Sequence, residues 1–133
     1  MVAGFIIGLG AVTVIDIHGF LGRKSRYWTL ATIRTHKVTK PLIWIGLVLL
    51  VIGYNFLYNG NLLLLQWCIT IVMIMNGIFL SFRVSPFLLS QEKKAKDTEL
   101  LPQSLQKKIT VSFIFSFLSW WGSLVLFIDY LLV

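Results

Sequence analysis

The lysine and arginine residues of this chain are confined to two stretches of sequence. All 12 of them fall within residues 23–40 and 83–108, and the remaining stretches, 1–22, 41–82 and 109–133, contain none. A soluble protein distributes its basic residues over its whole surface, whereas a membrane protein collects Lys and Arg in the cytoplasmic connections between its apolar spans. This segregation predicts an integral membrane protein with both basic stretches on one side of the bilayer.

The composition supports this class and bears against a nucleic-acid partner. Hydrophobic residues make up 57% of the chain and charged residues 13%, far from the usage of a soluble domain. The formal net charge is +7, but the basic residues flank apolar spans and form no separate domain. The basic residues are therefore expected to bind the anionic head groups of membrane lipids. We expect membrane lipids as partners and no nucleic acid.

Four apolar stretches are long enough to cross a bilayer as helices, for which about 20 apolar residues are needed. They are residues 2–21, 41–58, 62–82 and 109–133. The sequence thus predicts a single transmembrane domain with an all-α fold, an integral membrane four-helix bundle. Because Asp16 and His18 oppose insertion of the first stretch, three spans with an interfacial first helix are the alternative.

The positions of the two basic stretches predict the orientation of the bundle. They connect the first span to the second and the third span to the fourth, so both lie on the same side of the membrane. The positive-inside rule makes that side cytoplasmic. The N- and C-termini are then outside, in a multi-pass protein of the cell inner (cytoplasmic) membrane.

The connections differ in kind. Residues 59–61, Asn-Gly-Asn, predict a tight turn, and Tyr54, Tyr58 and Trp67 beside it are typical of a head-group belt. The connection 83–108 is mixed in charge and predicts a solvated loop.

The connection 22–40 leaves two interpretations open. Its middle, 27–33, mixes aromatic and aliphatic residues among cations, as in an interfacial helix. Pro41 either begins the second span, where its missing N–H matters little, or kinks a longer helix that runs from about Ser25.

Small residues on two faces predict where the helices pack. Gly4 and Gly8 form a GxxxG pattern in the first span, and small residues permit close approach of membrane helices. The last span has serines on one helical face: Ser112, Ser116, Ser119 and Ser123. We expect contacts inside the bundle and no pore, although such faces also serve a homo-oligomer. Trp120 and Trp121 are expected as a buried pair, and Cys68 as a small buried side chain.

The less common polar residues of the spans lie toward the predicted cytoplasmic side. They are Asp16, His18, His36 and Asn76. Ionisable groups at membrane depth are candidates for function, so we expect this group to bind an ion, a proton or a lipid head group. Its basic surroundings are Arg23, Arg34, Lys37, Lys40 and Arg83. A structural alternative is that Asp16 pairs with Arg23 or Lys40 and anchors the first connection.

The two histidines also suit a cofactor or a metal ion. His18 and His36 come from different predicted helices at similar depth, as the axial ligands of haem b would. A transition-metal site could add Asp16 as a third ligand, although Asp16 and His18 are about 200° apart around a helix. Interfacial hydrogen bonds to backbone or lipid phosphate are the alternative role for both histidines.

The chain resembles small bacterial four-helix membrane proteins that are loosely similar to the copper-resistance D-like group. The resemblance lies in a basic first connection that ends in His36, shortly before an apolar stretch with Trp44 and Gly46, and in the Ser-Trp-Trp-Gly of residues 119–122. It covers most of the chain. It implies a membrane bundle in which His18 and His36 would handle copper or haem.

Two functional hypotheses follow. No nucleotide-binding loop, nucleophile–base pair or paired-carboxylate site is apparent, so the first is a non-enzymatic small transporter or accessory subunit with a polar site on its cytoplasmic side. The second is a membrane redox module that binds haem b or a metal ion through His18 and His36.

Overall fold

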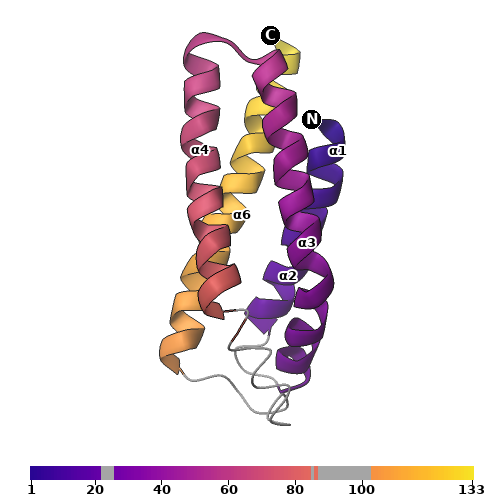
Figure 1. Cartoon of the computed structure of the whole chain (residues 1–133), viewed down its shortest axis with the longest axis vertical. Coiled ribbons are helices and arrows are strands. Elements are labelled where there is room, and N and C mark those ends of the chain that lie inside the picture. Colours follow the sequence, from indigo (N-terminus) through magenta and orange to yellow (C-terminus); the bar gives the residue numbers. More distant parts are fainter. Residues whose placement is uncertain (22–25, 85, 87–102) are drawn as a thin grey trace.

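The structure, a computed structural model, describes residues 1–21, 26–84, 86 and 103–133. Every regular element within these residues is helical (Figure 1). The first helix runs without interruption through α1 (Val2–Gly4), the π-helical segment η1 (Phe5–Leu9) and α2 (Gly10–Leu21). It is followed by α3 (Arg26–Leu57), by α4 (Gly60–Phe79) with the π-helical segment η2 (Leu80–Val84), and by α6 (Gln103–Leu132).

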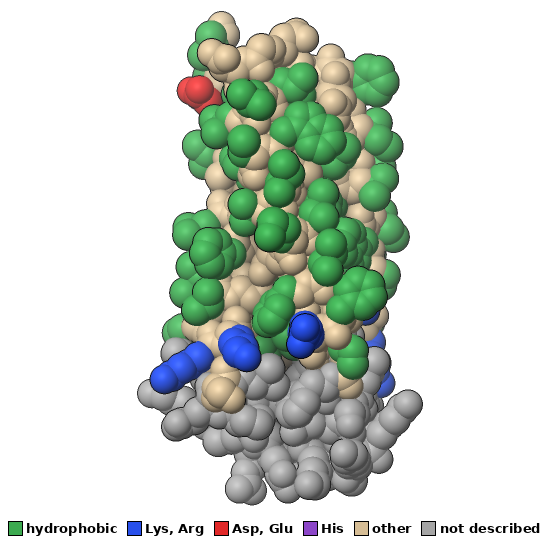
Figure 2. Space-filling model, turned by 60° about the vertical axis from the view of Figure 1, so that its left-hand side comes forward, with side chains coloured by type: hydrophobic (Ala, Val, Ile, Leu, Met, Phe, Trp, Pro, Cys, Tyr) green, Lys and Arg blue, Asp and Glu red, His purple; other side chains and the backbone are tan. Residues whose placement is uncertain are grey.

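Four helical segments are long and apolar enough to cross a membrane. They are Val2–Leu21, Ala31–Leu57, Gly60–Val84 and Gln106–Leu132. Figure 2 shows large hydrophobic side chains spread along the length of the bundle, and Phe56, for example, is 86% exposed. Exposed apolar surface on this scale is unfavourable in water, whereas it is compatible with the hydrocarbon of a lipid bilayer. The predicted four apolar helices are confirmed, and the chain has the architecture of a multi-pass membrane protein.

The longest helix differs most from the prediction. α3 has 32 residues and is therefore about 48 Å long, whereas the hydrocarbon core of a bilayer is about 30 Å thick. It begins at Arg26 and contains Pro41 in its interior, so Pro41 does not start a helix and most of the predicted loop 22–40 is helical. The longer helix from about Ser25 is confirmed. Lys and Arg are good helix formers whose long side chains carry their charges into water.

A short turn connects α3 to α4, as predicted from Asn-Gly-Asn. Asn59 is extended, with φ −135°, and Gly60 has φ +59°. Because side chains disfavour positive φ, glycine is the residue suited to this position.

Glycines bring the first helix close to α3. A Cβ atom on Gly4 would lie 2.8 Å from the backbone nitrogen of Leu50, and one on Gly46 would collide with the backbone of Gly8. The GxxxG face is therefore used inside the bundle, as predicted for a helix contact.

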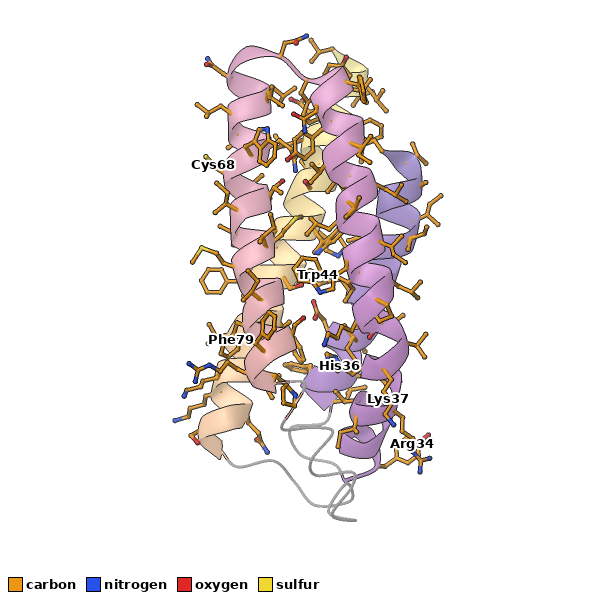
Figure 3. The ribbon with its side chains drawn as sticks, viewed as in Figure 1. Arg34, His36, Lys37, Trp44, Cys68 and Phe79 are labelled. Carbon is orange, nitrogen blue, oxygen red and sulfur yellow. The ribbon has the colours of Figure 1, made fainter. Side chains whose placement is uncertain are left out.

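α6 packs against both α4 and the first helix. Ser112, Ser116 and Ser123 are buried on it, as expected for a contact face. The predicted buried tryptophan pair is wrong: Trp120 is buried, but Trp121 is 39% exposed, because consecutive helical residues point about 100° apart. Cys68 is likewise exposed, on the outer side of α4 (Figure 3), and not buried.

The two ends of the bundle differ in charge. The Lys and Arg side chains visible in Figure 2 gather at one end, which we call the basic end. The α3–α4 turn and the chain termini lie toward the opposite end (Figure 1). The described side chains of the basic end are Arg34, Lys37, Lys40, Arg83, Lys107 and Lys108.

Candidate functional site

Asp16 lies inside the bundle on the buried face of α2. Its side chain is 8% exposed, and it shares this face with Val12 and Ile15, which are 0% and 5% exposed. The Oδ2 atom is buried and has no hydrogen-bond partner among the described residues. No ion pair joins Asp16 to Lys40 in the part of the chain that the structure describes, and Arg23 lies outside that part. An unpaired carboxyl group within a span is unfavourable in its charged form.

His36 extends from α3 toward the interior of the bundle (Figure 3). Its Nε2 atom is buried and has no hydrogen-bond partner among the described residues. The nearby Thr39 hydroxyl does not serve His36 Nε2, because it donates to the carbonyl oxygen of Thr35 at 3.1 Å. Lys40, one turn further along α3, is close enough to His36 to act on it electrostatically.

The antiparallel register of the first helix and α3 brings Asp16 and His36 to adjacent levels. A Cβ at Gly4 would meet Leu50, and one at Gly8 would lie 3.2 Å from Gly46 Cα. Continued at the same rise per residue, this register places position 16 opposite position 38 and position 18 opposite position 36. The predicted common depth of Asp16, His18 and His36 follows from these contacts. We call Asp16 and His36 the aspartate site.

The structure does not assemble the predicted three-ligand metal site. No group of three or more His, Cys, Asp or Glu residues lies within ligating reach of one ion in the described part of the chain. His18 instead has its Nδ1 atom 2.7 Å from the carbonyl oxygen of Val14 on the same helix. Residues two apart project to different sides of a helix, so Asp16 and His18 do not converge.

The predicted basic residues divide between the outside of the bundle and its edge. Arg34 and Lys37 are exposed and point outward from α3 (Figure 3), whereas Lys40 is half-buried. Arg23 lies outside the described residues. The outward pair is therefore directed away from the aspartate site, whereas Lys40 acts electrostatically on His36.

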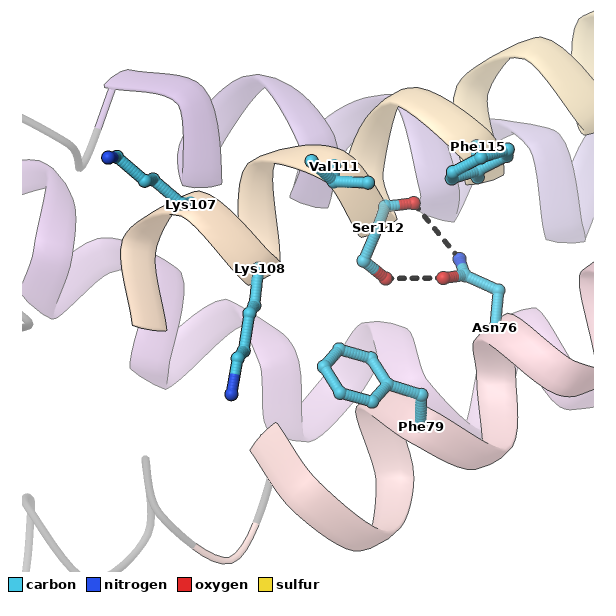
Figure 4. A pocket seen from close by; sticks show the side chains of 7 residues that line it. All are labelled: Asn76, Phe79, Lys107, Lys108, Val111, Ser112 and Phe115. Carbon is cyan, nitrogen blue, oxygen red and sulfur yellow. Dashed lines mark hydrogen bonds between the residues drawn. The ribbon is translucent and has the colours of Figure 1, made fainter. Parts of the chain in front are cut away.

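Asn76 does not contribute its amide group to the aspartate site. Its Nδ2 atom donates to the backbone carbonyl of Ser112 at 3.1 Å, and its Oδ1 atom accepts from the Ser112 hydroxyl (Figure 4). These bonds tie α4 to α6. A partner on the neighbouring helix thus already bonds the Asn76 amide, and the role of Asn76 in binding an ion or a lipid stays a prediction.

A second group of buried polar residues lies in the half of the bundle away from the basic end, and the sequence analysis did not find it. We call it the tyrosine–glutamine cluster, made of Tyr54, Tyr58, Gln66, Thr70 and Ser123, all at most 1% exposed. Its signal in the sequence is the spacing of four residues between Tyr54 and Tyr58 and between Gln66 and Thr70, which places each pair on one helical face.

Short contacts connect the members of this cluster. Gln66 Nε2 donates to the hydroxyl of Ser123, and the Thr70 hydroxyl donates to the backbone carbonyl oxygen of Gln66 at 2.8 Å. The Tyr54 hydroxyl faces Thr70 without the geometry of a hydrogen bond. The hydroxyls of Tyr54 and Tyr58 and Oε1 of Gln66 are buried without a partner among the described residues.

The tyrosines of this cluster do not form the predicted head-group belt. Tyr54 packs edge-on against Trp67, with ring centroids 5.4 Å apart, and Tyr58 packs against Tyr130 at 5.2 Å. Burial, with Tyr130 nearby, raises the pKa of Tyr58 to about 12, so this residue at the end of the bundle remains neutral at physiological pH. The aromatic residues here belong to the core, where their rings contribute packing.

No protein-family model, curated protein or solved structure matches this chain. Its site is therefore interpreted from its own residues.

Proposed function

We propose that this protein is a non-enzymatic transporter or accessory subunit that binds a proton or a small cation at Asp16. The basic end, where Arg34 and Lys37 meet anionic head groups, would face the cytoplasm, with both termini outside. The support for this orientation is the confinement of Lys and Arg to residues 23–40 and 83–108, whose described Lys and Arg side chains lie at that end, as in cytoplasmic connections of the inner membrane. The first turns of α3 would lie at the head-group level, because the helix exceeds the hydrocarbon thickness.

The observation that carries the proposal is the buried, unpartnered Oδ2 of Asp16. A charged carboxylate at this depth is strongly unfavourable, and a bound proton or cation removes the net charge. A lipid phosphate is itself anionic and would be repelled. The chemistry of Asp16 therefore favours a cationic ligand.

His36 is the residue that we propose as the second proton-carrying group. Its Nε2 atom is buried without a partner among the described residues, and it lies about half a turn from the level of Asp16, on the side of the basic end. An imidazole exchanges protons near neutral pH. A proton could pass through it between water at the basic end and Asp16.

The test compares Asp16→Asn with Asp129→Asn. Asp129 is exposed on α6 near the opposite end, so the second variant makes the same chemical change away from the site. Infrared spectra of the reconstituted protein would show the C=O band of a protonated carboxylic acid at neutral pH. We expect Asp16→Asn to remove this band and Asp129→Asn to retain it. Retention of the band in Asp16→Asn would contradict the proposal.

A flux measurement separates the transporter from the accessory subunit. Vesicles that contain a trapped pH dye and the purified protein are subjected to a pH step, with and without an external cation. A transporter would collapse the gradient faster than empty vesicles, and Asp16→Asn would abolish the difference while Asp129→Asn preserved it. An accessory subunit would retain the infrared signature and give no flux by itself.

A redox module with haem b between His18 and His36 is the second candidate. It is favoured by their common level and by the unpartnered Nε2 of His36. The contact of His18 Nδ1 with Val14 is the kind of bond that orients an axial imidazole. A Soret band in the purified protein, lost in His18→Ala and in His36→Ala, would support this candidate. A colourless, metal-free preparation would eliminate it.

A further inference from the structure

A groove lies between α4 and α6 at the basic end of the bundle (Figure 4). Its volume is about 390 Å³, within the size range of small-molecule sites. The lining residues are Asn76, Phe79, Lys107, Lys108, Val111, Ser112 and Phe115. The groove is distinct from the aspartate site, and neither Asp16 nor His36 lines it.

The inner part of the groove is suited to an apolar group. Phe79, Val111 and Phe115 provide aromatic and aliphatic surface. The two uncharged polar residues of the lining, Asn76 and Ser112, are bonded to each other. A polar ligand placed here would have to break those bonds, whereas a hydrocarbon chain would leave them intact.

The outer part of the groove is cationic. Lys107 and Lys108 are exposed. Figure 4 shows the Lys108 side chain extending toward the α4 side and the Lys107 side chain extending away from it, both nearer the beginning of α6 than Phe115. None of the lining residues that the structure describes is acidic. The apolar span that includes these lysines begins at Gln106, so the ammonium groups lie where the span meets the head groups.

We propose that this groove is a binding site for one anionic phospholipid. The phosphate would contact Lys108 on the α4 side of α6, Lys107 would add its positive charge at the same end, and the first part of an acyl chain would lie over Phe79, Val111 and Phe115. Basic pockets between transmembrane helices bind anionic head groups in this way. A soluble anion would leave the apolar surface unused, and a neutral lipid would leave the lysines unpaired. The combination of both surfaces selects an anionic lipid from the surrounding leaflet.

The experiment is native mass spectrometry of the detergent-solubilised full chain with dioleoyl phosphatidylglycerol or dioleoyl phosphatidylcholine. We expect one phosphatidylglycerol to bind in preference to phosphatidylcholine. The double variant Lys107→Ala/Lys108→Ala should weaken the binding of phosphatidylglycerol about tenfold, because each lysine near the membrane surface raises the affinity for an anionic lipid by roughly a few fold. Val111→Trp, which fills the groove and keeps both lysines, should also weaken it.

The matched control is Arg34→Ala/Lys37→Ala. It removes the same charge from the same end of the bundle, but on α3 and away from the groove. Binding should remain within about twofold of wild type in this variant. Equal losses in the two double variants would overturn the proposal in favour of a diffuse charge effect. Displacement of the lipid by soluble glycerophosphate would also overturn it, because the head group alone would then account for binding. Circular dichroism and unfolding of each variant establish that the helices are intact.

Discussion

The two buried polar regions of this bundle differ in the kind of polar group that each contains. The tyrosine–glutamine cluster contains neutral amide and hydroxyl groups: Gln66, Thr70 and Ser123 bond to each other or to backbone, and the Tyr54 and Tyr58 hydroxyls and Gln66 Oε1 have no partner among the described residues. The aspartate site contains titratable groups whose buried Oδ2 and Nε2 atoms have no partner among the described residues. Neutral polar groups can be satisfied by a neighbouring helix, whereas an isolated acid requires a proton or a counter-ion. The comparison separates a region of neutral polar groups from one whose titratable groups are the candidates for binding.

The two regions also depend on different helix contacts. The two residues of the aspartate site come from the first helix and α3, which approach closely at Gly8 and Gly46. The Gln66–Ser123 bond joins α4 to α6. A substitution at one contact can therefore perturb one region and spare the other.

The largest effect is expected from Gly46→Ala. The added Cβ would collide with the Gly8 backbone and push the first helix away from α3, with a loss of about 3 kcal/mol in the free energy of unfolding. Denaturation in mixed micelles measures this loss. The control is Gly10→Ala, because a Cβ at Gly10 has no heavy atom within 4 Å. Equal stability of the two variants would show that the glycine contact does not hold the aspartate site.

A smaller loss is expected from Ser123→Ala. The variant removes the acceptor for Gln66 Nε2 and leaves a buried donor unpaired, which should lower the free energy of unfolding by about 1.5 kcal/mol. The double variant Gln66→Leu/Ser123→Ala removes both partners and should recover most of that stability. If the double variant were as unstable as Ser123→Ala, the bond would not be the source of the loss.

The smallest effect, of opposite sign, is expected from Asp16→Leu. Replacing an unpaired buried carboxyl by an apolar side chain of similar size should raise the free energy of unfolding by about 1 kcal/mol, while proton or cation binding is lost. Asp129→Leu is the control, since exposed substitutions typically change stability by less than about 0.5 kcal/mol. A destabilised Asp16→Leu variant would instead indicate that Asp16 has a structural partner.

The fold was largely predictable because apolar length and charge placement are properties of the chain itself. The stretches 2–21 and 62–82 correspond closely to helices that the structure shows. The residue at which α3 begins is ambiguous in the sequence, because Pro41 is compatible both with a helix start and with a helix interior. Only the packing around it decides between them.

The candidate site was predictable in depth but not in partnership. Asp16 and His36 were identified because ionisable residues in a span are rare, and the glycine register supports their common level. The pairing of Asn76 with Ser112 and the burial of Tyr54 and Tyr58 depend on which helices are neighbours. An aromatic residue near a helix end fits a lipid belt or a core equally well until its facing helix is known.

The position of Cys68 allows the depth of α4 in the membrane to be measured on the native chain. It is the only cysteine of the sequence and is exposed on the outer side of α4. A spin label on this thiol would extend away from the bundle into the surrounding lipid, without any substitution in the protein. Oxygen concentrates in hydrocarbon and a water-soluble nickel complex is excluded from it, so their relative effects on the label report the distance of α4 from the aqueous phase. The immersion of the bundle can thus be measured on the unaltered sequence.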